Sequence, residues 1–99
     1  MKMSRKNEDE RIVIKVVGTI DQESSDFESE INKALDLGQK TICLDMKKTV
    51  YISSAGLCVL IASYKRALAL HKRLLITDMS DRVREVLEVV GVSDIFPSK

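Results

Sequence analysis

Aromatic side chains are scarce in this chain of 99 residues, where they make up 4% and tryptophan is absent. The core must therefore be built from aliphatic residues, chiefly Val, Ile, Leu, Ala and Met. An excess of one charge is also missing, because 16 basic residues nearly balance 15 acidic ones and leave a formal net charge of +1. This balance lacks the electrostatic footprint of nucleic-acid binding, so no direct contact with nucleic acid is expected.

Metal ligands and catalytic bases are few as well. The chain has two cysteines, Cys43 and Cys58, which form no CxxC pair, and a single histidine, His71. A zinc site cannot be assembled from so few ligands at these spacings, and no cofactor is expected. Both cysteines lie in apolar runs, so they are predicted to be reduced residues of the core, in keeping with a reducing cytosol.

Long apolar runs are missing too. The first 13 residues lack the apolar h-region of a signal peptide, and the longest apolar run is far shorter than the ~20 residues of a membrane span. A hydrophobic content of 44% with 31% charged residues is typical of a globular domain. We therefore expect one cytoplasmic domain over residues 1–99, without a membrane span.

The apolar periodicity alternates between strand-like and helix-like along the chain. Strands are predicted over residues 2–6, 11–20, 40–46, 49–52 and 73–77, with residues 92–96 as an edge strand or a loop. Helices are predicted to begin at Ser25, at Ser54 and after Asp78 or Ser80, and to end before Gly38, His71 and Gly91. Helices that link successive strands indicate an α/β domain with a mainly parallel or mixed sheet.

Most catalytic motifs are absent. No GxGxxG or GxxxxGK[ST] motif is present to cradle a phosphate. A Ser-His-Asp triad would need His71, which lies about 25 Å from Ser54 at the opposite end of the same predicted helix. Asp21 follows one predicted strand and Asp45 lies at the end of another, where a turn or cap role is the usual one. Asp21 precedes a helix at the carboxyl edge of the sheet, where α/β proteins build their sites.

Two adjacent serines, Ser53 and Ser54, interrupt the most apolar part of the chain in the stretch "VYISSAGLCVL". As an N-cap, either hydroxyl would stabilise the helix that follows by about 1 kcal/mol relative to alanine. The same helix N-terminus also favours an anion, and a phosphate added there would bring about −1.5 to −2 charges. The spacing alone leaves both interpretations open.

Three stretches resemble the STAS domain of bacterial anti-sigma-factor antagonists: "VVGTID", "CLDMKKTVYISSAGLCVLIASYKRALAL" and "RLLITDMSDRVREVLEVVGVSDIF". The resemblance covers nearly the whole chain. Its most specific part is residues 52–57, where the family reads roughly Asp-Ser-Ser/Thr-Gly-Leu. The resemblance implies a STAS-like α/β fold, with a mixed sheet of about four to five strands and helices packed on one side, and no enzyme activity.

In that family the domain binds an anti-sigma factor that is also a serine kinase, and this binding releases the sigma factor. The kinase phosphorylates one serine of the antagonist, which ends the binding, and a phosphatase reverses the modification. With Gly56 as the motif glycine, the resemblance implies Ser54 as the phosphorylated residue and Ser53 as the second candidate. The partner-binding residues that it implies are Asp21, Ser53, Ser54, Ala55, Gly56 and Leu57.

Two positions depart from the family pattern. Ser53 stands where the family usually has aspartate, which removes a negative charge beside the acceptor. Ala55 stands in the second Ser/Thr position, which leaves Ser53 and Ser54 as the only hydroxyls of the motif. Two other functions stay open: a stand-alone STAS subunit of a lipid-transport or stress-signalling complex, and a small hydrolase using Ser54, which the missing base disfavours.

Overall fold

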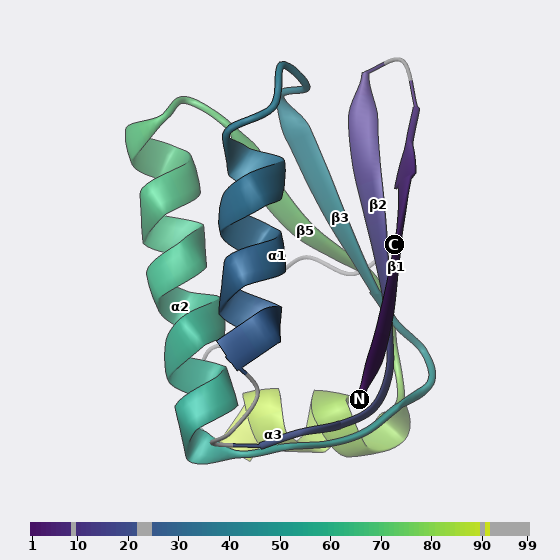
Figure 1. The fold of residues 1–99 in the computed structure, drawn as a ribbon. Helices are drawn as coiled ribbons and strands as arrows, with labels where there is room; N and C mark the ends of the chain where they lie inside the picture. The colour runs from purple at the N-terminus through teal and green to yellow at the C-terminus, as the bar shows by residue number, and fades with distance from the viewer. Residues whose placement is uncertain (9, 22–24, 90, 92–99) are drawn as a thin grey trace.

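Five strands and three helices form within residues 1–8, 10–21, 25–89 and 91, which are the residues that the computed structural model describes (Figure 1). In chain order they are β1 (Lys2–Asn7), β2 (Arg11–Ile20), α1 (Ser25–Leu35), β3 (Thr41–Met46), β4 (Thr49–Ile52), α2 (Ser54–Ala69), β5 (Arg73–Met79) and α3 (Asp81–Val89). The tail predicted over residues 92–96 lies outside the described residues. None of the described helices is long and apolar enough to cross a membrane.

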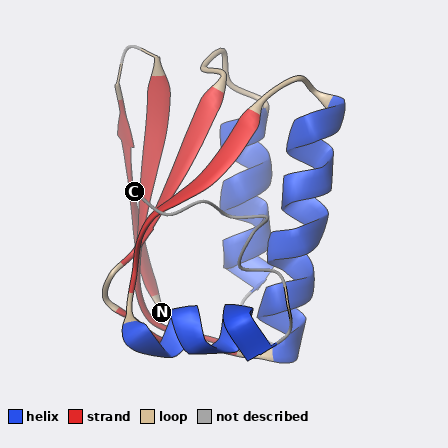
Figure 2. Ribbon diagram, turned by 180° about the vertical axis from the view of Figure 1, so that it is seen from behind, coloured by secondary structure: helices blue, strands red, loops and turns tan. Residues whose placement is uncertain are grey.

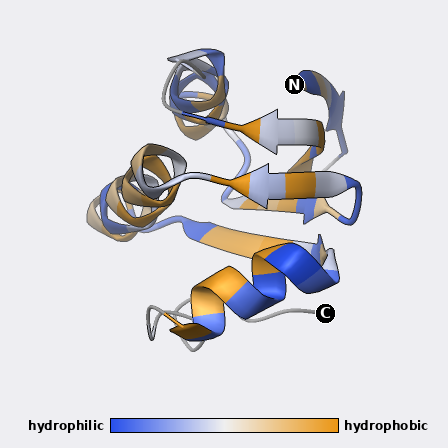
Figure 3. Ribbon diagram, turned by 90° about the horizontal axis from the view of Figure 1, so that it is seen from below, coloured by the Kyte–Doolittle hydropathy of each residue, from blue (hydrophilic) through white to orange (hydrophobic). Residues whose placement is uncertain are grey.

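The sheet is mixed, as expected. Its main order is β1-β2-β3-β5, with β1 antiparallel to β2 and the other neighbours parallel, while β4 pairs in parallel with the end of β2. The helices α1 and α2 lie side by side on one face of the sheet (Figures 1 and 3). The shorter α3 crosses the end of the sheet, where it packs against β4 and β5 (Figure 2). These features confirm the STAS-like α/β architecture.

The core of the described residues is chiefly aliphatic, and its one phenylalanine, Phe27 of α1, is fully buried. In β2 the buried residues alternate with partly exposed ones, as a strand with one covered face requires. Figure 3 shows hydrophobic segments in the strands and in all three helices. The buried face of α2 includes Leu57, Leu60 and Ala67, whereas Leu68 in its last turn is 55% exposed.

Local signals located most of the element ends. β5 runs two residues further than predicted, so Asp78 belongs to the strand, and Ser80 caps α3 by accepting a hydrogen bond from Val83 N–H at 3.3 Å. Among the described residues α1 begins at Ser25, as predicted. The turn role expected for Asp45 is confirmed, because its Oδ1 accepts from Lys47 N–H at 3.2 Å.

A short interruption separates β3 from β4. At this turn the buried Thr49 donates its hydroxyl to Val16 O at 2.9 Å, and Gly18 N–H donates to Lys48 O at 3.0 Å. Ser80 then ties the start of α3 to the same place by donating its hydroxyl to Thr49 O at 2.5 Å. These bonds align β4 with the last residues of β2, and this alignment brings their carboxyl ends together.

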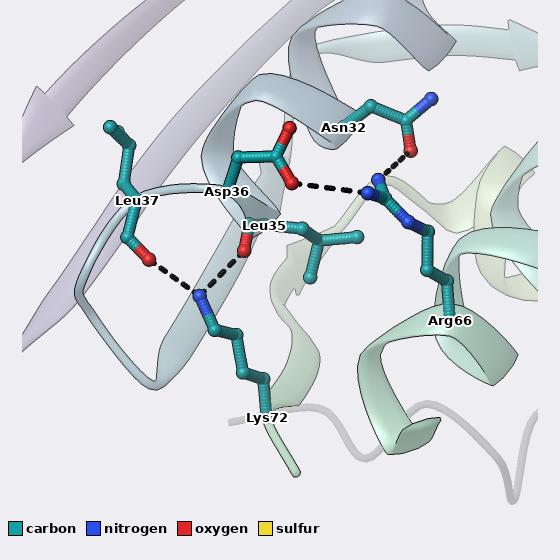
Figure 4. A network of polar contacts seen from close by, with 6 residues as sticks. All are labelled: Asn32, Leu35, Asp36, Leu37, Arg66 and Lys72. Carbon is teal, nitrogen blue, oxygen red and sulfur yellow. Dashed lines mark hydrogen bonds and ion pairs between the residues drawn. The ribbon is translucent and has the colours of Figure 1, made fainter. Parts of the chain in front are cut away.

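The helices α1 and α2 are joined by side chains near their C-terminal ends (Figure 4). Arg66 of α2 donates to Asn32 Oδ1 at 2.7 Å and to Asp36 Oδ1 at 3.1 Å. All three groups are partly or largely solvent-exposed, so each bond contributes modestly to stability. They connect the last turn of α2 to the end of α1 and the residue that follows it.

Lys72, which follows α2, also binds the C-terminal end of α1. Its Nζ donates to the backbone carbonyls of Leu35 and Leu37 at 2.5 Å each (Figure 4). Carbonyl groups at the end of a helix have no partner within the helix, so a cation here both satisfies them and complements the helix dipole.

His71 ends α2 in a left-handed conformation, with φ of 59°. Its N–H donates to Leu68 O at 3.0 Å, and the next N–H, of Lys72, donates to Ala67 O at 2.8 Å. This pair of bonds is a Schellman motif, whose left-handed position is usually occupied by glycine. Histidine there carries a steric cost that glycine would not have.

We therefore expect His71→Gly to raise the free energy of unfolding by about 0.5–1 kcal/mol, because relief of left-handed strain exceeds the added chain entropy. Chemical denaturation measures this change. The matched control is Ala69→Gly, in the right-handed last turn, which should lower the free energy of unfolding by about 0.5–1 kcal/mol. Destabilisation by both substitutions alike would contradict the assignment of strain to His71.

Candidate functional site

The end of β2 and the start of α2 meet through the backbone. Ser53 N–H donates to Ile20 O at 2.8 Å, which extends the pairing of β2 with β4 by one step. Asp21, which follows Ile20 directly and is exposed, therefore lies at the same sheet edge as the two serines. This edge is formed by the carboxyl ends of parallel strands, so the structure places these predicted residues where α/β proteins build their sites.

The structure separates the roles of the two serines. Ser53 is the N-cap of α2, with extended backbone angles (φ −81°, ψ 171°), and its Oγ accepts a hydrogen bond from Gly56 N–H at 3.1 Å. It is half-buried, and its carbonyl accepts the first helical bond, from Leu57 N–H at 2.9 Å. Ser54 is the first residue of the helix and is exposed. One hydroxyl thus caps the helix while the other faces solvent.

Gly56 makes the close approach of α2 to the sheet possible. A Cβ atom at this position would lie 2.6 Å from Ile20 Cγ2 and 3.0 Å from Ile52 Cγ1, closer than real contacts allow. Leu57 enters the core next to it, and Ala55 is half-buried. The expected partner-binding residues therefore divide, because Gly56 and Leu57 lie in the interior while Asp21 and Ser54 are exposed.

The cysteine prediction is right for one residue and wrong for the other. Cys43 in β3 is 1% exposed, and burial raises the pKa of its thiol. Cys58 in α2 is exposed, because the helix turns Leu57 and Leu60 inward and directs the residue after Leu57 outward. The sequence did not show that Cys58 is exposed, because apolar residues surround it in the chain and periodicity assigns each residue to a helix face only approximately.

Among the residues that the structure describes, no general base accompanies Ser54 at this edge in the manner of a Ser-His pair. His71 follows the opposite end of α2 from Ser54 (Figure 1), so these two side chains cannot form a nucleophile–base pair. Among the described residues, no three His, Cys, Asp or Glu side chains come together as metal ligands. What the edge offers is an exposed hydroxyl on the first turn of a helix.

Comparison with known proteins agrees with this arrangement. The family model described as "Mlab, STAS domain" matches residues 3–97. The chain belongs to the STAS domain family. A relative of this STAS domain is the "Putative anti-sigma factor antagonist BtrV" of Bordetella bronchiseptica (strain ATCC BAA-588 / NCTC 13252 / RB50). It is 30% identical over 98 residues, which cover 98% of this chain and 84% of that protein.

Solved structures share the fold of this STAS domain. An anti-sigma factor antagonist from Mycobacterium paratuberculosis superimposes with a TM-score of 0.86 at 20% identity, covering 98% of this chain and 83% of that one. The anti-sigma factor antagonist SpoIIAA in its unphosphorylated form gives a TM-score of 0.83 at 18% identity, covering 99% and 88%. At these identities the likeness shows the fold.

The contact at Gly56 predicts that Gly56→Ala lowers the free energy of unfolding by about 1–3 kcal/mol, because the added methyl group forces α2 away from Ile20 and Ile52. Denaturant titration monitored by circular dichroism measures the loss. The matched control is Gly38→Ala, since no atom lies within 4 Å of a Cβ built there. That substitution should be neutral or slightly stabilising. Equal effects at both glycines would contradict the packing role of Gly56.

The two serines should respond differently to removal of the hydroxyl. Ser53→Ala should lower the free energy of unfolding by about 1 kcal/mol, because Gly56 N–H loses its cap. Ser54→Ala should leave it within about 0.5 kcal/mol of the wild type, as expected for an exposed surface position. Thermal or chemical unfolding of the two variants tests this, and the reverse order of effects would overturn the cap assignment.

Proposed function

We propose that this STAS domain is an anti-sigma-factor antagonist that binds an anti-sigma factor serine kinase, releases the sigma factor, and is switched off by phosphorylation of Ser54. The observation that carries the proposal is the exposed hydroxyl of Ser54 on the first turn of α2, beside the end of β2 and Asp21. Its relatives support it, since both BtrV and SpoIIAA are described as anti-sigma factor antagonists. The proposed circuit is a binding switch that operates in the cytoplasm.

Ser54 is a better phosphate acceptor than Ser53 for reasons of access. The Ser53 oxygen already accepts a hydrogen bond from Gly56 N–H, and its side chain is half-buried. The Ser54 side chain is exposed, so a kinase reaches it without unfolding the helix start. A solved structure described as SpoIIAA of Bacillus in the phosphorylated form indicates that this fold tolerates phosphorylation.

The proposed modification is an ordinary phosphoryl transfer. Ser54 Oγ attacks the γ-phosphorus of ATP held by the kinase, the bond to the β-phosphate oxygen breaks, ADP leaves, and the hydroxyl proton passes to a base of the kinase. The product carries about −1.5 to −2 charges at the positive end of the α2 dipole, where they are tolerated. Release of the partner then follows from charge and bulk rather than from unfolding, and a serine phosphatase restores the hydroxyl by hydrolysis.

The departure at Ser53 tunes this switch. Aspartate and serine are both good N-caps, so the helix start is preserved with either residue. Serine leaves the first turn of α2 without an acidic residue, so the unphosphorylated surface at this edge is less negative than in the usual pattern. The charge that phosphorylation adds is therefore larger relative to the negative charge already present at this helix start.

Incubation of the purified protein with ATP and each anti-sigma factor kinase encoded by its own genome tests the proposal. We expect mass spectrometry to find one phosphate, on Ser54, which Ser54→Ala abolishes and Ser29→Ala on the exposed face of α1 does not. Ser54→Asp should weaken binding to that kinase at least tenfold.

Phosphate on Ser53 would move the acceptor by one residue. Unchanged affinity of Ser54→Asp would exclude the charge mechanism. An absence of both binding and phosphate with every kinase would favour the alternative of a stand-alone STAS subunit in a lipid-transport or stress-signalling complex.

A further inference from the structure

Large apolar side chains that are exposed gather at the two ends of the described molecule. Those on the Ser54 side include Val50, Tyr51 and Val89, which are 64%, 43% and 81% exposed. Those at the other end, near the C-termini of α1 and α2, are Leu37, Leu68 and Leu70. We call the first set, Val50 and Tyr51 of β4 with Val89 of α3, the β4–α3 patch.

A bulge in β4 exposes two of the three residues. Thr49 pairs with Gly18 and Tyr51 pairs with Thr19, so Val50 is an extra residue without a partner in β2. A regular strand would direct neighbouring side chains to opposite faces, whereas here both Val50 and Tyr51 reach solvent. Bulges of this kind re-aim side chains and are frequent beside functional sites.

Val89 has no local reason to be apolar. It ends α3 with its side chain largely in solvent, and valine is a weaker helix former than the arginines and glutamates elsewhere on this helix. The residues of α3 that hold the helix to the core are Val83 and Leu87, which are fully buried. Val89 is therefore outside the core that the described residues form.

The patch adjoins Ser54. Tyr51 precedes Ser54 by three residues, and α3 packs alongside β4. Figures 1 and 2 both show α3 at the end of the domain where α2 starts. The exposed hydroxyl and the three apolar side chains thus face solvent at one end of the domain.

We propose that the β4–α3 patch is the surface on which the anti-sigma factor kinase docks, through an apolar surface of its own, while its active site reaches Ser54. This inference rests on the proposed function. A kinase that phosphorylates Ser54 must cover the residues around it, and burial of large exposed side chains is the main source of affinity in such an interface. The patch supplies these side chains without cost to the core.

The apolar patch also explains how a phosphate on Ser54 would weaken binding of the kinase. A phosphate on Ser54 would lie at the border of an apolar interface, where the bound kinase would remove water from it. Removing water from a charge that gains no partner is strongly unfavourable. Phosphorylation therefore weakens docking through desolvation as well as through bulk, and the apolar character of the surroundings determines how strongly.

The test uses substitutions that keep the backbone preferences. The triple variant Val50→Thr, Tyr51→Thr and Val89→Thr places a β-branched residue at both strand positions and keeps a similar helix propensity at the third. The control variant Leu68→Gln and Leu70→Gln removes exposed apolar groups at the opposite end of α2. Thermal unfolding verifies that both variants are folded, and calorimetry without ATP measures the Kd for the kinase that phosphorylates Ser54.

We expect the triple variant to raise the Kd at least tenfold and the control variant to leave it within twofold. If the triple variant binds like the wild type while Ser54→Asp does not bind, the docking surface is overturned and the proposed function stands. If both variants lose affinity equally, the effect is not specific to the patch and the surface is again overturned. If no kinase binds or phosphorylates the wild-type protein, the proposed function fails, and this docking surface fails with it.

Discussion

The hydrogen bond from Ser53 N–H to Ile20 O, at 2.8 Å, is the constraint on which the site depends. It joins the end of β2 to the residue that caps α2, so Asp21 and Ser54 come to one sheet edge. The bond forms only because α2 starts very close to the sheet. Gly56 allows this approach, since any larger residue would collide with Ile20. A backbone contact and a missing side chain therefore hold together two segments more than thirty residues apart.

The turn between β3 and β4 aligns β4 with the end of β2, next to the bond between Ser53 and Ile20. Without the turn at Lys47–Lys48, the chain would continue in register with β2 and deliver its end to a different place. Thr49 compensates the broken ladder by donating its hydroxyl to Val16 O, and Ser80 fixes the start of α3 to Thr49 O. The bulge that follows in β4 leaves Val50 without a partner in β2. The same irregularity that aligns the serines also exposes apolar residues beside them.

The opposite end of the molecule is held in another way. Arg66 and Lys72 bind side-chain and carbonyl oxygens of α1 and the loop after it, and His71 closes α2 in a left-handed turn. These contacts fix the helical layer far from Ser54. The first turn of α2, at the other end of this helix, is where Ser54 lies exposed.

Local chemistry in the sequence determined the elements and the candidate site. Apolar periodicity located the strands and helices, and the serine pair before an apolar helix marked a cap. Sequence left open which serine is the cap, because both hydroxyls precede the same helix, and it wrongly placed Cys58 inside. Only the tertiary structure decided these points, together with the exposure of Val50 and the close approach at Gly56. The physical reason is that burial, strand pairing and interatomic distance depend on segments remote in the chain, whereas periodicity and capping depend on neighbours.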